Sequence, residues 1–224
     1  MENIKLVAYK LISLDKIPST QIWAHDLIAN NTATDKTVIV ANSQTSGHGR
    51  YGRKWISHSG NLYASFIYKI KRYDPKISYS IAVAVAETLI YFGVKPKIKW
   101  PNDILIDGKK VSGILIEYDK NFVIIGIGID VNHAPKLLEY QTAKMNDFVK
   151  VSMQELLSML IKKIDLWRNA DFEKVRERWQ DLAVGINQEI KYRTKQVKMI
   201  GLDNSGALVL NDGNKDILIY GAEL

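Results

Sequence analysis

The sequence contains no cysteine in its 224 residues. Disulfides, thiolate metal ligands and a cysteine nucleophile are therefore excluded. Long apolar runs are also missing: no stretch approaches the roughly 18 consecutive apolar residues of a membrane-spanning helix, and residues 1–10 are too polar for the core of a secretion signal. We expect a soluble, cytoplasmic protein with no membrane partner.

The composition, 46% hydrophobic and 25% charged, is that of a folded chain with one sizeable core or a core plus a small appendage. Its formal net charge of +7 raises the question of an anionic partner, such as nucleic acid, an anionic membrane face or small-molecule phosphates. The lysines are spread along the chain, which is equally typical of a solvated surface. Residues 42–56, however, contain His48, Arg50, Arg53 and Lys54 without an acidic residue, and this stretch predicts an anion site.

β-Branched and alternating runs predict strands, and longer apolar periodic segments predict helices. Strands are expected at 4–12, 37–43, 61–70, 97–100, 103–106, 111–118 and 122–132, and helices at 20–30, 78–92, 154–167 and 172–183. Ser19 is a typical N-cap, Gly93 a typical helix stop, and Asp107-Gly108 a hairpin turn. We therefore predict an α+β fold with a mixed central sheet and flanking helices.

Beyond Gly185 the pattern changes to short alternating runs separated by turn sequences, which predicts a small β-barrel. We place a domain boundary near residue 184. The expected domains are a catalytic, ligand-binding domain at 1–184 and a C-terminal barrel at 185–224.

Residues 45–55, TSGHGRYGRKW, contain the spacing G-x-G-x-x-G. A dinucleotide fold needs the third glycine to begin a helix and an acidic residue about 20 positions later for the ribose. Neither is predicted here, and the kinase and Walker patterns are absent as well. The glycines instead allow close approach of the backbone to a ligand, and Arg50 and Arg53 offer planar donors to phosphate or carboxylate oxygens. We expect this loop to become ordered when it closes over an anion, although a solvated basic turn has the same composition.

Residues 99–117, KWPNDILIDGKKVSGILIE, are the second informative stretch. Proline restricts the residue before it to extended backbone, so Asn102 and Asp103 lie at the mouth of a strand, where side chains reach a ligand. Asp103 is a candidate metal ligand or base. Lys110 begins a strand in which Gly113 leaves room for a flat ligand. Alternatively, Asn102 and Asp103 are ordinary turn residues and Lys110 is a surface residue.

Together these stretches resemble the biotin protein ligases, the enzymes that biotinylate acetyl-CoA carboxylase. The family's loop reads close to G-R-G-R-R-G-R-K-W, here Gly47–Trp55, and its K-W-P-N-D segment matches Lys99–Asp103 letter for letter. The resemblance also includes Ser19, Thr20, Gln44, the VSGILIE segment, the run from Gly126 to Asn132 and the small C-terminal barrel. It implies a core like that of class II synthetases, an SH3-like barrel, and the monofunctional form without the family's DNA-binding domain.

The resemblance implies a two-step reaction. Biotin and MgATP give biotinyl-5'-AMP, and a lysine of a biotin carboxyl carrier protein then receives the biotin. The catalytic residues implied are Arg50, Lys110 and Asp103, with Asp103 also a candidate Mg²⁺ ligand. The biotin-binding residues implied are Ser19, Thr20, Gln44, Gly47, His48, Arg50, Lys110, Gly113 and Leu115. The nucleotide-binding residues implied are Arg50, Arg53, Trp55, Lys99, Asn102, Asp130 and Asn132. Trp55 is expected to pack over the closed loop.

Two positions depart from the family pattern. His48 stands where arginine is common, and its smaller charge at neutral pH predicts weaker retention of the adenylate. Asp130 replaces the usual asparagine, which removes an amide donor near the expected adenine site.

Three other functions fit the sequence less well. A lipoate-type ligase shares the chemistry, but the chain has no R-x-x-G-G-G segment, and an octanoyl transferase needs the missing cysteine. A nucleic-acid binder would present exposed stacking rings, whereas Tyr63, Phe66 and Tyr68 fall in an apolar run. We therefore expect no nucleic-acid partner, and a homodimer stays open.

Overall fold

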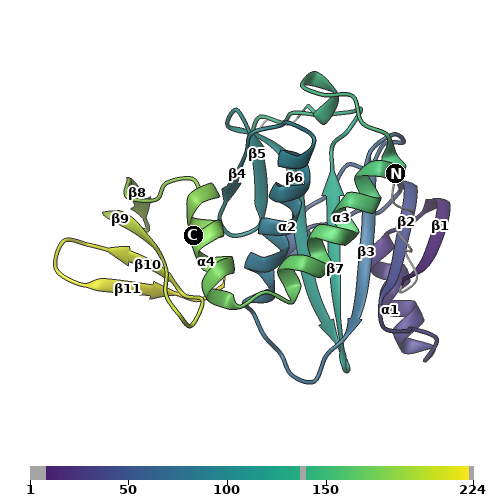
Figure 1. Ribbon diagram of the computed structural model, residues 1–224, viewed down its shortest axis with the longest axis horizontal. Helices are drawn as coiled ribbons and strands as arrows, with labels where there is room; N and C mark the ends of the chain where they lie inside the picture. The colour runs from purple at the N-terminus through teal and green to yellow at the C-terminus, as the bar shows by residue number, and fades with distance from the viewer. Residues whose placement is uncertain (1–8, 137–139, 222–224) are drawn as a thin grey trace. The chain divides into compact units, whose positions relative to one another are not determined.

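The computed structural model describes residues 9–136 and 140–221, which divide into two compact units (Figure 1). The first unit comprises the chain up to Tyr73 together with Val111–Met153. The second comprises Asp74–Lys110 and the chain from Gln154 onward. Of the strand expected at 4–12, residues 4–8 lie outside the described residues.

The first unit contains a mixed sheet with strand order β1-β2-β3-β7-β6. Its elements are β1 (Lys10–Ile17), α1 (Thr20–Ala29), β2 (Thr37–Gln44), η1 (Arg50–Gly52), β3 (Leu62–Lys69), β6 (Lys109–Asp119), β7 (Phe122–Ile129) and η2 (Met145–Asp147). β1 pairs in parallel with β2, because α1 carries the chain back across the sheet, and the pairs β2–β3, β3–β7 and β7–β6 are antiparallel. The predicted mixed sheet is therefore confirmed.

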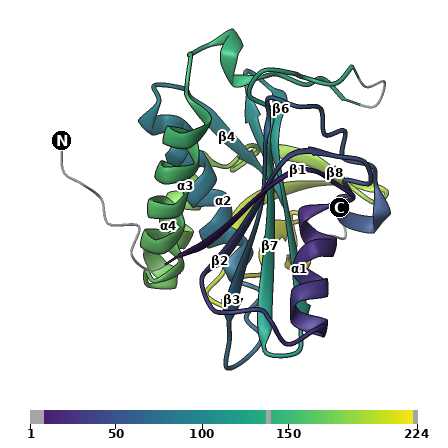
Figure 2. The same cartoon turned by 90° about the vertical axis from the view of Figure 1, so that its right-hand side faces the viewer.

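The helix α1 lies along one face of this sheet (Figure 2). Its residues Ala24 and Ile28 are buried against Ile39, Ile67 and Ile124 of three neighbouring strands. The predicted N-cap is also confirmed, because the Ser19 hydroxyl accepts the backbone N–H of the second helical residue at 3.2 Å. Packing and capping together fix where the helix begins.

The second unit combines three helices, a hairpin and a separate four-stranded antiparallel sheet of order β11-β10-β9-β8 (Figure 1). Its elements are α2 (Ile77–Tyr91), β4 (Pro96–Lys99), β5 (Asp103–Ile106), α3 (Met153–Arg168), α4 (Phe172–Leu182), β8 (Glu189–Tyr192), β9 (Lys195–Leu202), β10 (Leu208–Asn211) and β11 (Asp216–Ile219). The predicted small C-terminal β-structure is confirmed by this sheet.

The helix α2 is buried along most of its length, as its apolar sequence predicts. Its one acidic side chain, Glu87, is 3.2 Å from the ammonium of Lys163 on α3 and 2.6 Å from the guanidinium of Arg178 on α4. Burial alone would raise the pKa of Glu87, but the hydrogen bonds and charges of its two partners outweigh burial and lower it. This carboxylate therefore links the three helices.

The turn Asp107-Gly108 joins β5 to β6, as predicted. Both residues have positive φ, 49° for the aspartate and 74° for the glycine, which is the requirement of a type I′ hairpin turn. Among residues 9–136 and 140–221, the structure contains no helix with the length and apolar character needed to cross a membrane.

Candidate active site

The glycine-rich loop after β2 forms a short hairpin. The Trp55 N–H donates to the Gly47 carbonyl at 2.9 Å, and the Gly49 N–H donates to the Arg53 carbonyl at 2.7 Å. A single 3₁₀ turn, Arg50–Gly52, closes the tip. Residues 53–61, all described, contain no helix, so the G-x-G-x-x-G spacing does not form a dinucleotide loop here.

Cationic side chains are concentrated at the tip of this hairpin. The guanidinium of Arg50 lies 5.2 Å from the centre of the Tyr51 ring, and its Nη2 is 3.3 Å from the Tyr51 hydroxyl. Arg53 and Lys54 are exposed, and His48 pairs with Lys54 across the hairpin. The hairpin therefore presents donors and positive charge to an incoming anion.

The base of the hairpin lies beside the start of α1. The backbone N–H of Thr20 donates to Gln44 Oε1 at 2.8 Å, and the N–H of Ser46 donates to the Pro18 carbonyl at 2.8 Å. Gln44 in turn donates through Nε2 to the Ser57 hydroxyl at 2.8 Å. The structure thus brings together four of the predicted biotin-binding residues: Ser19, Thr20, Gln44 and Gly47.

Gly47 has no room for a side chain. A Cβ at this position would lie 2.6 Å from Ser57 Oγ and 2.6 Å from the Trp55 carbonyl oxygen. Gly49, two residues further on, differs, because its Cβ would have only an ordinary contact of 3.8 Å with the Arg53 carbonyl oxygen. The first glycine of the motif is therefore required by packing, and the second is not.

Trp55 packs on the sheet at the end of the hairpin. A Cβ on Gly128 of β7 would lie 2.6 Å from Nε1 and Cε2 of the indole. Gly113 of β6 is the registered partner of Gly128, and Leu115 is the partner of Gly126. Because Gly128 has no side chain, the Trp55 ring packs directly against the backbone of β7.

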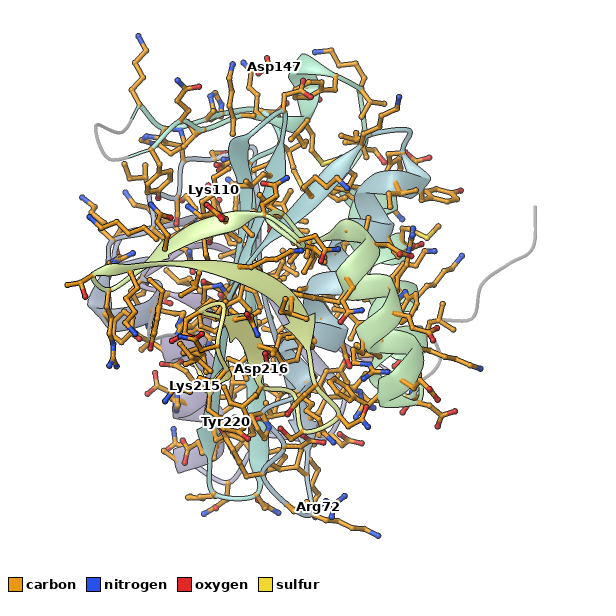
Figure 3. The ribbon with its side chains drawn as sticks, turned by 90° about the vertical axis from the view of Figure 1, so that its left-hand side faces the viewer. Arg72, Lys110, Asp147, Lys215, Asp216 and Tyr220 are labelled. Carbon is orange, nitrogen blue, oxygen red and sulfur yellow. The ribbon has the colours of Figure 1, made fainter. Side chains whose placement is uncertain are left out.

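In the second unit, the two predicted catalytic residues outside the loop form an ion pair. Lys110 Nζ is 2.6 Å from Asp103 Oδ1, and both side chains are largely buried (Figure 3 labels Lys110). Lys99 is exposed and pairs with Asp103 in the β4–β5 register, and Asn102 is half-buried in the connecting turn after the cis peptide Trp100-Pro101. These four residues belong to the second unit, whereas the loop belongs to the first.

Asp130 and Asn132 have local partners in the first unit. Asp130 is buried and accepts from Asn61 Nδ2 at 2.9 Å. Asn132 donates through Nδ2 to the Gly60 carbonyl and accepts from Asn146 Nδ2. These bonds give both side chains a structural role, and their contact with a nucleotide stays a prediction.

Asn61 is a residue that the sequence did not single out. Its Oδ1 accepts the N–H groups of Val131, Asn132 and His133 at 2.9, 2.9 and 3.0 Å. One buried side chain thus holds the turn that follows β7. The only signal in the sequence was its place at the start of an apolar strand, which does not reveal a long-range hydrogen bond.

Polar residues on α1 and β6 form a second group that the sequence did not indicate. His25 Nδ1 lies 2.9 Å from Asp119 Oδ2, and its Nε2 lies 3.3 Å from Glu117 Oε2. Burial alone lowers the pKa of His25, but the hydrogen bonds and charges of the two carboxylates outweigh burial and raise it. Gln21 Nε2 donates to the same Glu117 oxygen at 2.7 Å.

No group of three metal-binding side chains is present within residues 9–136 and 140–221. Asp103 is therefore a candidate Mg²⁺ ligand that does not belong to such a group. Mg²⁺ commonly binds one or two carboxylates together with substrate phosphates and water, so a single carboxylate is compatible with a metal carried by ATP.

Comparison with known proteins identifies the class. A family model described as biotin/lipoate A/B protein ligase matches residues 13–132. The bifunctional ligase/repressor BirA of Bacillus subtilis is 34% identical over 98% of this chain and 75% of its own length. The biotin–[acetyl-CoA-carboxylase] ligase of Mycobacterium tuberculosis is 25% identical over 94% of this chain and 88% of its own length.

A solved structure gives the same result. The biotin protein ligase of Aquifex aeolicus, in complex with biotin and ATP, superposes with a TM-score of 0.84 at 27% identity, covering 96% of this chain and 97% of its own. The chain belongs to the biotin/lipoate A/B protein ligase family. Since the relatives from Mycobacterium tuberculosis and Aquifex aeolicus are biotin ligases, the resemblance based on residues 47–55 and 99–103 is confirmed.

Proposed function

We propose that the protein is an ATP-dependent biotin–[acetyl-CoA-carboxylase] ligase. It activates biotin as biotinyl-5'-AMP and transfers the biotinyl group to a lysine of a biotin carboxyl carrier protein. The observation that carries the proposal is the position of Gln44, which lies at the base of the cationic hairpin and accepts the N–H of Thr20 at 2.8 Å. Hydrogen-bonding groups suited to a cyclic urea therefore lie next to cations suited to phosphate.

In the first step, a carboxylate oxygen of biotin attacks the α-phosphorus of ATP. The new bond joins this oxygen to phosphorus, the bond to the β-phosphate oxygen breaks, and pyrophosphate leaves. Both reactants are anions, so their approach requires neutralisation, and preorganised cations supply it most effectively. We assign this role to Arg50 and Arg53, whose planar guanidinium groups can each donate to two oxygens.

Lys110 is the third cation in the proposal. Its ammonium is held 2.6 Å from Asp103 Oδ1, which fixes the charge in a partly buried environment. We assign Lys110 to the biotin carboxylate, and Asp103 to the orientation of this lysine and to Mg²⁺ carried by ATP. When bound, Mg²⁺ neutralises charge on the phosphate oxygens.

In the second step, the neutral amine of the carrier lysine attacks the acyl carbon of the adenylate. A carbon–nitrogen bond forms, the carbon–oxygen bond to AMP breaks with its electron pair going to AMP, and the proton lost by the amine passes to water. We propose Asp103 as the group that orients this amine. Closure of the hairpin over the adenylate is proposed to exclude water, because water would hydrolyse the mixed anhydride.

The remaining contacts complete the proposal. The biotin ring is assigned to Ser19, Thr20, Gln44, Gly47, His48, Gly113 and Leu115. The nucleotide is assigned to Arg50, Arg53, Trp55, Lys99, Asn102, Asp130 and Asn132. We further propose a cytoplasmic location, a catalytic segment at 1–184 and a smaller C-terminal β-domain at 185–224. A homodimer is left to measurement.

The proposed function is tested with the purified chain, labelled biotin, MgATP and a biotin carrier domain. We expect label on a carrier lysine and an ATP–pyrophosphate exchange that depends on biotin. Arg50→Gly should slow this exchange by about 100-fold, because one preorganised charge donor is removed. Arg72→Gly, a change of an exposed arginine outside the hairpin (Figure 3), should leave the rate unchanged.

Lipoate is the discriminating substrate. If lipoate supports exchange and labels the carrier while biotin does not, the protein is a lipoate-type ligase. If neither acid supports exchange, the proposal of an acyl-adenylate ligase is wrong.

A further inference from the structure

A buried tyrosine of α2 joins two turns of the second unit that are distant in sequence. The indole N–H of Trp100 donates to Tyr79 Oη at 3.4 Å, and the Tyr79 hydroxyl donates to the Gly206 carbonyl at 2.8 Å. Trp100 lies between β4 and β5, and Gly206 lies between β9 and β10 of the four-stranded sheet. All three residues belong to the second unit. One hydroxyl therefore bridges the turn that carries Asn102 and the C-terminal sheet.

The directions of the two bonds follow from the chemistry of the groups. An indole N–H can only donate and a backbone carbonyl can only accept, so the Tyr79 hydroxyl accepts from Trp100 and gives its one proton to Gly206. Burial and the negative charge of Asp203 raise the pKa of the Tyr79 hydroxyl and outweigh the Trp100 hydrogen bond, which acts to lower it. The hydroxyl therefore keeps the proton that it donates.

Trp100 is the anchor of its turn. Within residues 99–103, all of them described, it has the only buried side chain, and the proposed nucleotide contact Asn102 is half-buried. Pro101 stands between these two residues. Proline fixes its own φ and restricts the residue before it, so a displacement of the indole also moves Asn102.

The turn that offers the Gly206 carbonyl is held by Asp203. Its Oδ1 accepts the Ser205 N–H at 2.8 Å, the Ala207 N–H at 2.9 Å and the Ser205 hydroxyl at 2.7 Å. Gly206 has a φ of 87°, and a Cβ there would lie 2.8 Å from Cγ of Lys76, the residue before α2. The turn is therefore packed against the start of the helix that carries Tyr79.

A second connection holds the strand before the Trp100 turn. The Val184 N–H, just beyond α4, donates to the Ile98 carbonyl of β4 at 2.8 Å. On α4 itself, Gln180 Oε1 accepts the Leu202 N–H of β9 at 3.0 Å. These bonds fix the backbone of both strands, whereas the Tyr79 hydroxyl acts on a side chain within the turn.

We propose that Tyr79 is a positioning residue for ATP: its hydroxyl couples the turn 203–207 to Trp100, and through Trp100 it fixes Asn102. The inference rests on the proposed function, in which Asn102 contacts the nucleotide. It gives the C-terminal sheet a role in the first step of the reaction that requires no contact between the sheet and the ligand.

The test uses Tyr79→Phe in the full chain, with biotin-dependent ATP–pyrophosphate exchange measured at varied ATP and at varied biotin. Phenylalanine keeps the ring and removes only the hydroxyl. Since Trp100 and Gly206 then lose their partner in a buried place, we expect the KM for ATP to rise about fivefold with kcat nearly unchanged. The KM for biotin should stay nearly unchanged, because the residues assigned to the biotin ring belong to the first unit.

A double-mutant cycle separates this coupling from a direct contact of the turn with ATP. Asp203→Ala removes the acceptor that holds the turn and should also raise the KM for ATP, so it serves if Tyr79→Phe folds poorly. In the Tyr79→Phe background it should add little, because the turn no longer acts on Trp100. Additive increases would mean that the two residues act separately, which would overturn the proposal.

The indole N–H signal of Trp100 in a ¹⁵N-labelled chain gives a readout that does not depend on catalysis. Trp100→Phe identifies this signal by its loss. Its proton resonance should move upfield in Tyr79→Phe, because the N–H loses its acceptor, and in the same direction in Asp203→Ala. The signal of Trp23, on α1 in the first unit, should stay in place. A Trp100 signal that does not move in Tyr79→Phe contradicts the inference.

Thr88→Val is the matched control. Thr88 also has a buried hydroxyl on α2, and its Oγ1 donates to the Ala84 carbonyl one turn earlier at 2.8 Å. Removal of this local bond should leave the KM for ATP and the Trp100 signal unchanged. A KM for ATP that does not change in Tyr79→Phe, or that rises equally in Thr88→Val, contradicts the inference. Absence of biotin-dependent exchange in the wild type contradicts the proposed function instead.

Discussion

The indole of Trp55 lies directly on the backbone of Gly128, where an added Cβ would come within 2.6 Å of ring atoms Nε1 and Cε2. Trp55 also ends the cationic hairpin, because its N–H donates to the Gly47 carbonyl at 2.9 Å. This contact packs the end of the hairpin on β7. The position of the hairpin depends on a residue far from it in the sequence.

Gly128→Ala should displace the Trp55 ring and with it the hairpin. We expect a loss of about 1–3 kcal/mol in the free energy of unfolding, the usual cost of overpacking, and a raised KM for ATP. Urea unfolding and pyrophosphate exchange measure the two effects. In a double-mutant cycle with Trp55→Ala, the two changes should be strongly non-additive, and simple additivity would show that the two residues are not coupled.

Gly47→Ala and Gly49→Ala form a matched pair within one loop. Gly47→Ala should strongly reduce the rate of ATP–pyrophosphate exchange, because its Cβ would lie 2.6 Å from Ser57 Oγ and 2.6 Å from the Trp55 carbonyl oxygen. The second should stay close to wild type, since its Cβ has an ordinary contact at 3.8 Å and its φ is −116°. Steady-state exchange rates and Tm provide the comparison. Similar losses in both variants would argue against the hairpin as described.

His48→Arg should slow the release of biotinyl-AMP. Arginine carries a permanent charge and a planar set of donors suited to phosphate, and an additional charge beside the adenylate phosphate is worth about 1 kcal/mol in a solvated site, or roughly fivefold in rate. Trapping of released adenylate after rapid mixing measures the rate. Lys54→Arg, which keeps the charge of an exposed hairpin residue, is the control, and an unchanged or faster release from His48→Arg refutes the prediction.

Glu87→Gln should destabilise the second unit in a pH-dependent manner. The pKa of Glu87 is lower in the folded protein than its unfolded value of 4.5. Its contribution to the free energy of unfolding is therefore complete above pH 4.5 and is lost as the pH falls through the folded pKa. We expect the substitution to lower the free energy of unfolding by about 1.5–3 kcal/mol near neutral pH and by less in acid. Urea unfolding across pH measures it. Glu177→Gln, at an exposed position of α4, is the control and should have little effect on stability at any pH. If Glu87→Gln lowers the stability equally at every pH, the assigned ion pairs are wrong.

Local sequence was sufficient for most elements and for the class of protein. The N-cap at Ser19, the hairpin turn at Asp107-Gly108 and the buried helix α2 depend on residues close together in the chain, so patterns of spacing reveal them. The two motifs also indicated the family, because residues 47–55 and 99–103 match the pattern of the biotin protein ligases.

Only the tertiary structure decided which polar groups meet. The bonds from Asn61 to the turn after β7, and from Trp100 through Tyr79 to Gly206, join residues that are distant in sequence. The glycines that accommodate Trp55 and Lys76 are likewise explained only by what packs on them. Periodicity reports which face of an element is apolar, whereas a buried hydrogen bond depends on the register and approach of separate elements, and no single segment encodes these.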